Sequence, residues 1–227
     1  MVRELLAVGV SLAVAVVLVA VPAPSQTSVY INLQAKANHK LKDNFHSNTP
    51  GNSLAELPQG EQKLAGVKFK IGEGLIQLGS QILNDKPEKV EGISVDRKFA
   101  KLHILHGTGY GGGPNKEGSK LFVPDDTLIG KYLVHYEDKT KETIEIVYGK
   151  DVRDWWFTPD EKGVSRGQVA WEGENDRTKE FNGVKLRLYL TTWKNPNPDK
   201  KVVSIDYIST KSTAAAPFCV GMTAETK

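Results

Sequence analysis

Residues 184–193 read VKLRLYLTTW, a stretch in which aliphatic residues occupy every second position. The intervening positions carry charged, hydroxyl and aromatic side chains, among them Arg187, Tyr189 and Trp193. Successive residues of a β-strand point to opposite faces of the sheet, so a period of two predicts a strand with one face against a hydrophobic core. We therefore expect this stretch to belong to a sheet with one buried face and one wet face.

The same period recurs earlier in the chain. Residues 67–71 alternate apolar residues with lysine. Residues 127–137 and 143–148 also alternate, and they are joined by Asp138-Lys139-Thr140. Two alternating segments separated by so short a polar link predict a β-hairpin.

Two further strands are expected near the C-terminus, at 202–209 and 217–224. In the second of them, Phe218 and Met222 have the parity expected for the core, and Cys219 has the opposite parity. About ten segments of this kind, and no window with a sustained helical stripe, predict an all-β chain. The economical architecture is an antiparallel β-sandwich of jelly-roll type.

The N-terminus differs from the rest of the chain. Residues 5–21 carry no charge, consist almost wholly of Leu, Ala and Val, and end at Pro22. An apolar run of this length after a short basic start is typical of a signal peptide, so residues 1–25 predict a signal peptide or, if uncleaved, an N-terminal anchor. We expect an exported protein, located in the periplasm, on the cell surface or outside the cell, with residues 26–227 as a single β-sandwich domain.

Composition narrows the classes of partner and site. The chain has 227 residues, of which 30 are Lys or Arg and 27 are Asp or Glu, giving a formal charge of +3. Because the two signs are interleaved, no nucleic-acid partner is expected. A single cysteine, Cys219, excludes an intramolecular disulfide framework and a cysteine-rich zinc site.

No catalytic motif is found. Residues 107–112 read GTGYGG and match a dinucleotide-binding pattern, but the segment 113–118 that follows cannot open the required helix. His103 and His106 are three residues apart in an expected strand and therefore point to opposite faces. The sequence favours a buried, hydrogen-bonded His106 and gives no sign of an activated thiol at Cys219.

Aromatic residues beside polar ones point instead to carbohydrate. The run DVRDWWF at 151–157 places two indoles among acids and an arginine. The apolar face of a sugar ring stacks on Trp or Tyr, and its hydroxyls need polar partners. If the run is a strand, one indole points away from the other. The expected ligand-binding residues are Trp155, Trp156, Asp154, Arg153, Tyr110 and Asn195.

Both aromatic groups also have a structural interpretation. The tryptophan pair would plug the core beneath a loop, and Arg153 would form a salt bridge with a neighbouring acid. The face that carries Arg187, Tyr189 and Trp193 would be either a shallow ligand platform or a surface covered by the irregular segment 36–62. Covering is the favoured interpretation, because a wet sheet face seldom carries aromatic residues.

Four runs together resemble a family of bacterial secreted domains similar to galactose-binding-like jelly rolls. They are RKFAKLHILH at 97–106, GKYLVHYED at 130–138, YGKDVRDWW at 148–156 and WKNPNPDKKVVSIDY at 193–207. The resemblance covers about residues 30–225. Members of this family often accompany exported glycoside hydrolases and other surface enzymes, so the resemblance implies glycan binding.

The resemblance also implies a structural Ca²⁺ near the termini, although no cofactor is certain. Asp43, Asn44 and Asp206 are conceivable oxygen donors, but no loop has calcium-type ligand spacing.

The function predicted from the sequence is an exported, non-catalytic carbohydrate-binding module whose partner is a glycan or polysaccharide. One alternative is a structural or protein-interaction domain of the cell envelope, with envelope proteins as partners. Another is a polysaccharide hydrolase or lyase that uses acids which the sequence does not identify. Contact with a membrane is expected only through residues 5–21, if they are uncleaved.

Overall fold

Alternating side chains direct most of this chain into antiparallel strands. The computed structural model describes residues 27–46, 48–112 and 118–226. These residues form 14 strands, together with the short 3-10 helices η1 (Gln34–Lys36) and η3 (Thr178–Glu180). All pairings between the described strands are antiparallel, so the prediction of an all-β chain is confirmed.

The strands form two large sheets and one hairpin. The larger sheet has eight strands, and six of them follow the order β10 (Trp156–Phe157), β12 (Lys185–Lys194), β7 (Lys101–Gly109), β14 (Ala216–Glu225), β5 (Gly74–Gln77) and β2 (His39–Lys40). Its other two strands are β1 (Ser28–Ile31), paired with β14, and β11 (Gln168–Gly173), paired with β12. The four-stranded sheet has the order β6 (Lys89–Arg97), β13 (Val202–Ser209), β8 (Leu128–Tyr136) and β9 (Lys141–Val147). The separate hairpin pairs β3 (Gly60–Leu64) with β4 (Val67–Ile71).

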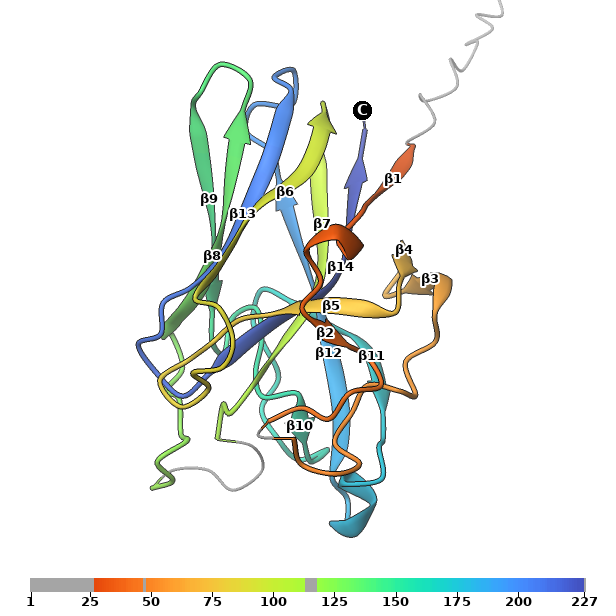
Figure 1. Ribbon diagram of the computed structural model, residues 1–227, viewed down its shortest axis with the longest axis vertical. Helices are drawn as coiled ribbons and strands as arrows, with labels where there is room; N and C mark the ends of the chain where they lie inside the picture. The colour runs from red at the N-terminus through yellow and green to blue at the C-terminus, as the bar shows by residue number, and fades with distance from the viewer. Residues whose placement is uncertain (1–26, 47, 113–117, 227) are drawn as a thin grey trace, which may run out of the picture.

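The two large sheets face each other, as in a β-sandwich, and a third layer covers the outside of the larger sheet (Figure 1). An inner core lies between the sheets and contains Tyr132, Ile205 and Tyr189. An outer core lies between the larger sheet and the covering layer, where Leu41 and Leu54 pack with the leucines of β12. The larger sheet is therefore buried on both faces.

This double burial corrects the expectation of a wet face on β12. Arg187 is 3% exposed and Tyr189 is fully buried, although both belong to the parity expected to face solvent. The irregular segment does cover this strand, but it lies over Leu186 and Leu188 on the opposite face. The buried Arg187 guanidinium is compensated by an ion pair with Glu161 at 2.6 Å, as a buried charge requires.

Bulges change the predicted parity in two other strands. The β8–β9 hairpin forms as predicted, but its register shifts between Leu128 and Gly130, which leaves Leu128 at the surface. The register of β14 shifts after Cys219, so Met222 joins the inner core whereas Phe218 packs in the outer core. A bulge inserts one unpaired residue, and every residue beyond it changes face.

Cys219 is completely buried in the inner core. Burial raises the pKa of its thiol to about 12. Cys219 therefore serves as a small buried hydrophobe, because an un-ionised, inaccessible thiol is unreactive.

The expected signal segment, residues 1–25, lies outside the described residues. Among the residues that are described, no helix has the length and apolar character needed to cross a membrane. The first described strand, β1, begins at Ser28.

His106 is buried and hydrogen-bonded, as predicted. Its Nε2 lies 2.9 Å from Thr191 Oγ1, and its Nδ1 lies 3.3 Å from the hydroxyl of Tyr132. Burial lowers the pKa of His106 to about 4. In the unfolded chain the imidazole takes up a proton near pH 6.5, so acid stabilises the unfolded state first.

We expect His106→Gln to reduce the sensitivity of the protein to acid. Between pH 7 and pH 5, the free energy of unfolding of the wild type should fall by about 2 kcal/mol more than that of the variant. Urea unfolding at both pH values measures this difference. Other titrating groups contribute equally to both proteins, so parallel losses of stability would contradict the assignment to His106.

Candidate functional site

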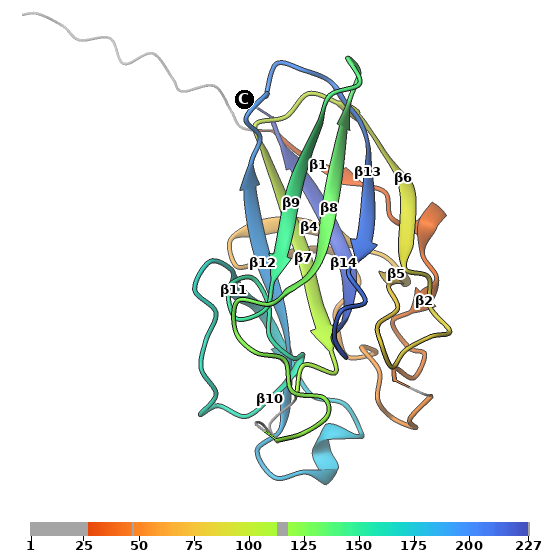
Figure 2. The same cartoon turned by 90° about the vertical axis from the view of Figure 1, so that its left-hand side faces the viewer.

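The end of the sandwich opposite the C-terminus contains a pocket of about 290 Å³. Figures 1 and 2 show β10 at this end, and the irregular segment after β2 reaches it. We call it the Trp156 pocket; its lining residues are His46, Thr49, Asn52, Tyr110, Gly112, Leu121, Asp154, Trp155, Trp156, Arg177 and Phe181. The structure therefore brings together Tyr110, Asp154, Trp155 and Trp156, which the sequence predicts as binding residues.

The two indoles have different environments. Trp155 is 1% exposed and packs in the outer core, with its ring 4.8 Å from Phe45 and 5.8 Å from Phe218. Trp156 begins β10, pairs with Leu186 of β12 and is only partly buried. Trp155 therefore plugs the core, and Trp156 is the more accessible of the two candidates for a stacking platform.

Hydrogen bonds hold Trp156 in one orientation. Its indole N–H donates to Asn52 Oδ1 at 3.1 Å, and its backbone N–H donates to Asp154 Oδ1 at 2.9 Å. The ring of Phe181 meets the indole edge to face, with centroids 5.7 Å apart. Asn52 Oδ1 also accepts from Asn175 Nδ2, so the partner of the indole is itself fixed.

Asp154 organises the glycine loop. Its Oδ2 accepts the backbone N–H of Gly111 at 2.6 Å, and its side chain is almost fully buried. Both carboxylate oxygens hold the backbone of the site itself, and the contact of Asp154 with ligand hydroxyls stays a prediction. Tyr110, which directly follows β7, has a φ of 57°, which is uncommon for a residue with a side chain.

His46 forms the wall facing Tyr110. Both residues have positive φ, and their rings lie 4.2 Å apart. Burial, followed by the charge of His39, lowers the pKa of His46 to about 3, so its imidazole is neutral near pH 7. Residues held in sparsely populated backbone regions concentrate at functional sites.

Most of the other lining residues are missed by the sequence analysis, and three of them carry polar or aromatic side chains suited to a ligand. Asn52, Arg177 and Phe181 belong to polar segments without period-two alternation. Phe181 is 43% exposed, and the guanidinium of Arg177 lies 5.0 Å from its ring centroid. An aromatic residue in a loop rich in Asn, Gly and charge is the signal that could have identified Phe181.

Arg153 lines a neighbouring cavity of about 720 Å³, which we call the Arg153 pocket. Its guanidinium bonds to Asp125 at 2.7 Å and to the carbonyl of Gly163 at 3.0 Å. The salt bridge of Arg153 with Asp125 corresponds to the structural interpretation of Arg153, in which it pairs with a neighbouring acid. The lining residues are Gly111, Gly112, Phe122, Val123, Pro124, Asp125, Tyr148, Arg153, Asp160, Glu161 and Lys162.

Asn195 is wrongly grouped with these residues. It follows β12, whereas Trp156 pairs with Leu186 near the beginning of that strand. A strand rises about 3.3 Å per residue, so Asn195 lies roughly 30 Å from the Trp156 pocket. Its amide instead accepts the hydroxyl of Tyr136 and donates to the carbonyl of Phe99, which is a structural role.

The oxygen donors considered for calcium also lie apart. Asp206 of β13 accepts the N–H of Gly92 at 2.9 Å and lies 2.6 Å from His135 Nε2. Asp43 and Asn44 belong to the layer on the far side of the larger sheet, so the three cannot share an ion. Within the part of the chain that the structure describes, no group of three or more His, Cys, Asp or Glu side chains is arranged to hold a metal.

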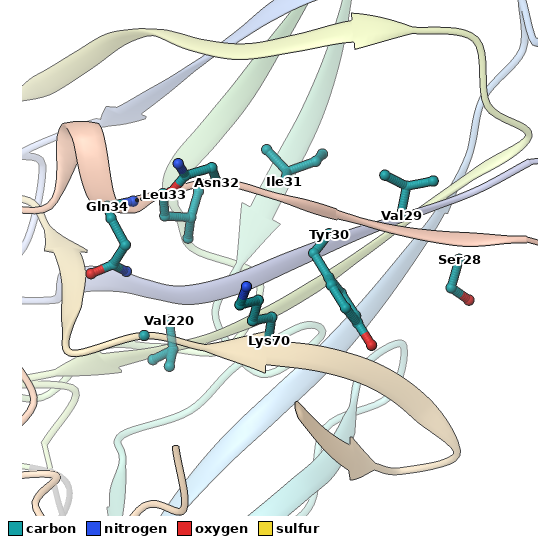
Figure 3. Close-up of a pocket in the computed structure, with 10 residues that line it drawn as sticks. Ser28, Val29, Tyr30, Ile31, Asn32, Leu33, Gln34, Lys70 and Val220 are labelled. Carbon is teal, nitrogen blue, oxygen red and sulfur yellow. Dashed lines mark hydrogen bonds between the residues drawn. The ribbon is translucent and has the colours of Figure 1, made fainter. Parts of the chain in front are cut away.

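Another cavity, of about 540 Å³, lies between β1 and β4 (Figure 3). The side chains of Tyr30 and Lys70 lie in the space between these strands, and Val220 of β14 forms part of its wall. Tyr30 is its one aromatic side chain, and none of the predicted binding residues lines it. The Trp156 pocket is therefore the better candidate for stacking.

Comparisons with known proteins add no assignment. No protein-family model matches the chain, and neither a curated protein nor a solved structure shows significant similarity to it. The resemblance to galactose-binding-like domains remains a prediction from the sequence.

The close contact between Gly109 and His46 provides a test of the architecture of the pocket. A Cβ at Gly109 would lie 1.8 Å from His46 Nε2, so Gly109→Ala must displace the imidazole from the pocket wall. We expect a loss of about 1–3 kcal/mol in the free energy of unfolding, the usual result of overpacking. Gly163→Ala is the control, because nothing lies within 4 Å of the added methyl group. Equal stabilities of the two variants in urea unfolding would contradict the contact.

Proposed function

We propose that this chain is an exported, non-catalytic carbohydrate-binding domain and that the Trp156 pocket is its binding site. The observation that carries the proposal is the pairing of two accessible aromatic rings, Trp156 and Phe181, in a pocket that also contains Asn52 and Arg177. The proposal includes the jelly-roll, galactose-binding-like type of sandwich and an export role for residues 1–25.

The chemistry of the pocket suits a sugar. A sugar ring presents C–H groups that pack on an aromatic face, and aromatic contacts of this kind contribute about 0.5–1.5 kcal/mol beyond burial. Arg177 has five N–H donors and uses Nη1 to bind Glu180, so donors remain for ligand hydroxyls. Polar and aromatic groups on one small surface fit a glycan better than a purely apolar ligand.

Pre-organisation supports binding through few contacts. Trp156 is held by Asn52 and Asp154, so little side-chain entropy is lost when a ligand stacks on it. The pocket is small, and we expect dissociation constants between millimolar and micromolar for one site. Several copies, or anchoring to a surface, would raise the effective affinity.

The test uses a glycan array followed by isothermal titration calorimetry. Phe181→Ala should weaken binding of the selected glycan about tenfold, because the ring is largely exposed and its loss removes a stacking partner. Trp156→Ala should weaken binding at least as much. Val203→Ala, which truncates an exposed residue of β13, is the matched control and should have no effect.

Two outcomes would overturn the proposal. One is the absence of binding to every glycan on the array and in solution. The other is a bound glycan whose affinity is unchanged in the Trp156 and Phe181 variants. Capture of an envelope protein that is indifferent to added sugars would favour the interaction-domain alternative, and release of reducing ends from polysaccharide would favour an enzyme.

A further inference from the structure

The Trp156 pocket and the Arg153 pocket are neighbours that share Gly112. Side chains that line each of the two pockets form hydrogen bonds with the backbone of Gly111. Its N–H donates to Asp154, which lines the first pocket, and its carbonyl accepts the hydroxyl of Tyr148, which lines the second, at 2.7 Å. The boundary between the pockets is therefore a short, fixed piece of main chain.

This boundary carries no side chain. A Cβ at Gly111 would lie 2.6 Å from the ring of Tyr148, so the position excludes larger residues. Gly112 has a φ of +100°, a conformation that favours glycine. Among the described residues, Gly111 and Gly112 therefore place no side chain of their own between the two pockets.

Each pocket has one exposed phenylalanine. Among the described residues, six large apolar side chains are exposed, and the two aromatic ones are Phe122 and Phe181, at 38% and 43%. Phe122 lines the Arg153 pocket and Phe181 lines the Trp156 pocket, although they are distant in the sequence. Large apolar side chains that are exposed to solvent at one end of a molecule mark a binding surface.

The Arg153 pocket is rich in hydrogen-bonding groups. Asp125, Asp160 and Glu161 supply carboxylates, and Arg153 and Lys162 supply cations. Its volume of about 720 Å³ lies within the usual range for small-molecule sites, whereas the 290 Å³ of the Trp156 pocket lies at the lower limit. The second pocket therefore has room and polar partners for units beyond the first.

We infer that the ligand is a linear oligosaccharide that crosses the Gly111–Gly112 backbone, with one unit on Trp156 and Phe181 and further units beside Phe122. This inference rests on the proposed function and specifies its ligand as a chain of at least two sugars. Phe122 contacts the second and later sugar units of the ligand, which a monosaccharide lacks.

Titration with ligands of increasing length tests the inference. The probes are glucose, cellobiose, cellotetraose and cellohexaose, and the corresponding series from xylan, mannan, galactan and chitin. For the series that binds, we expect affinity to rise about tenfold or more from one unit to four, as the second pocket is filled. Phe122→Ala should abolish this gain and leave the affinity for the single unit unchanged, whereas Phe181→Ala should weaken every length.

The controls separate this inference from the proposed function. Leu128→Ala truncates another exposed apolar residue and should leave all affinities unchanged, and thermal unfolding verifies that each variant is folded. An affinity that is independent of length, or a gain that survives Phe122→Ala, overturns the inference but leaves glycan binding intact. Absence of binding at every length in every series overturns the proposed function as well.

Discussion

Burial of the eight-stranded sheet on both faces is the constraint on which the other features of this protein depend. Each of its long strands contributes side chains to the inner core on one face and to the outer core on the other. The buried Arg187 and His106 in these strands have partners, Glu161 and Thr191, as buried polar groups generally require. A sheet covered on both sides is also a rigid base for loops at its ends.

The outer core positions the candidate site. Phe45 packs against Trp155 and Phe218 and so fixes the irregular segment on the sheet. The next residue, His46, and the nearby Asn52 consequently lie at the pocket. Trp155 and Trp156 divide these roles, because the first is buried in the outer core and the second packs against that core with its side chain still partly exposed at the pocket.

Hydrogen bonding within the site determines what remains for a ligand. Asp154 and Asn52 use their oxygens to hold backbone and indole, so they shape the pocket more than they contact its contents. Aromatic faces and the guanidinium of Arg177 are the groups that meet a ligand. Recognition at such a site depends on stacking geometry, and extension along the chain of a ligand is the available route to higher affinity.

Local pattern was sufficient for the strands that alternate clearly, the β8–β9 hairpin and the burial of His106, because period-two alternation is a property of neighbouring residues. The local pattern could not show which face of β12 packs against which layer, because alternation defines two faces of a strand but does not determine what covers each of them. The bulges at Leu128 and Cys219 depend on pairing with distant strands, and so does the remoteness of Asn195 from Trp156. His46, Asn52 and Phe181 reach the pocket only because long-range packing folds their segments onto the same end of the sheet, and such contacts leave no periodic trace in the sequence.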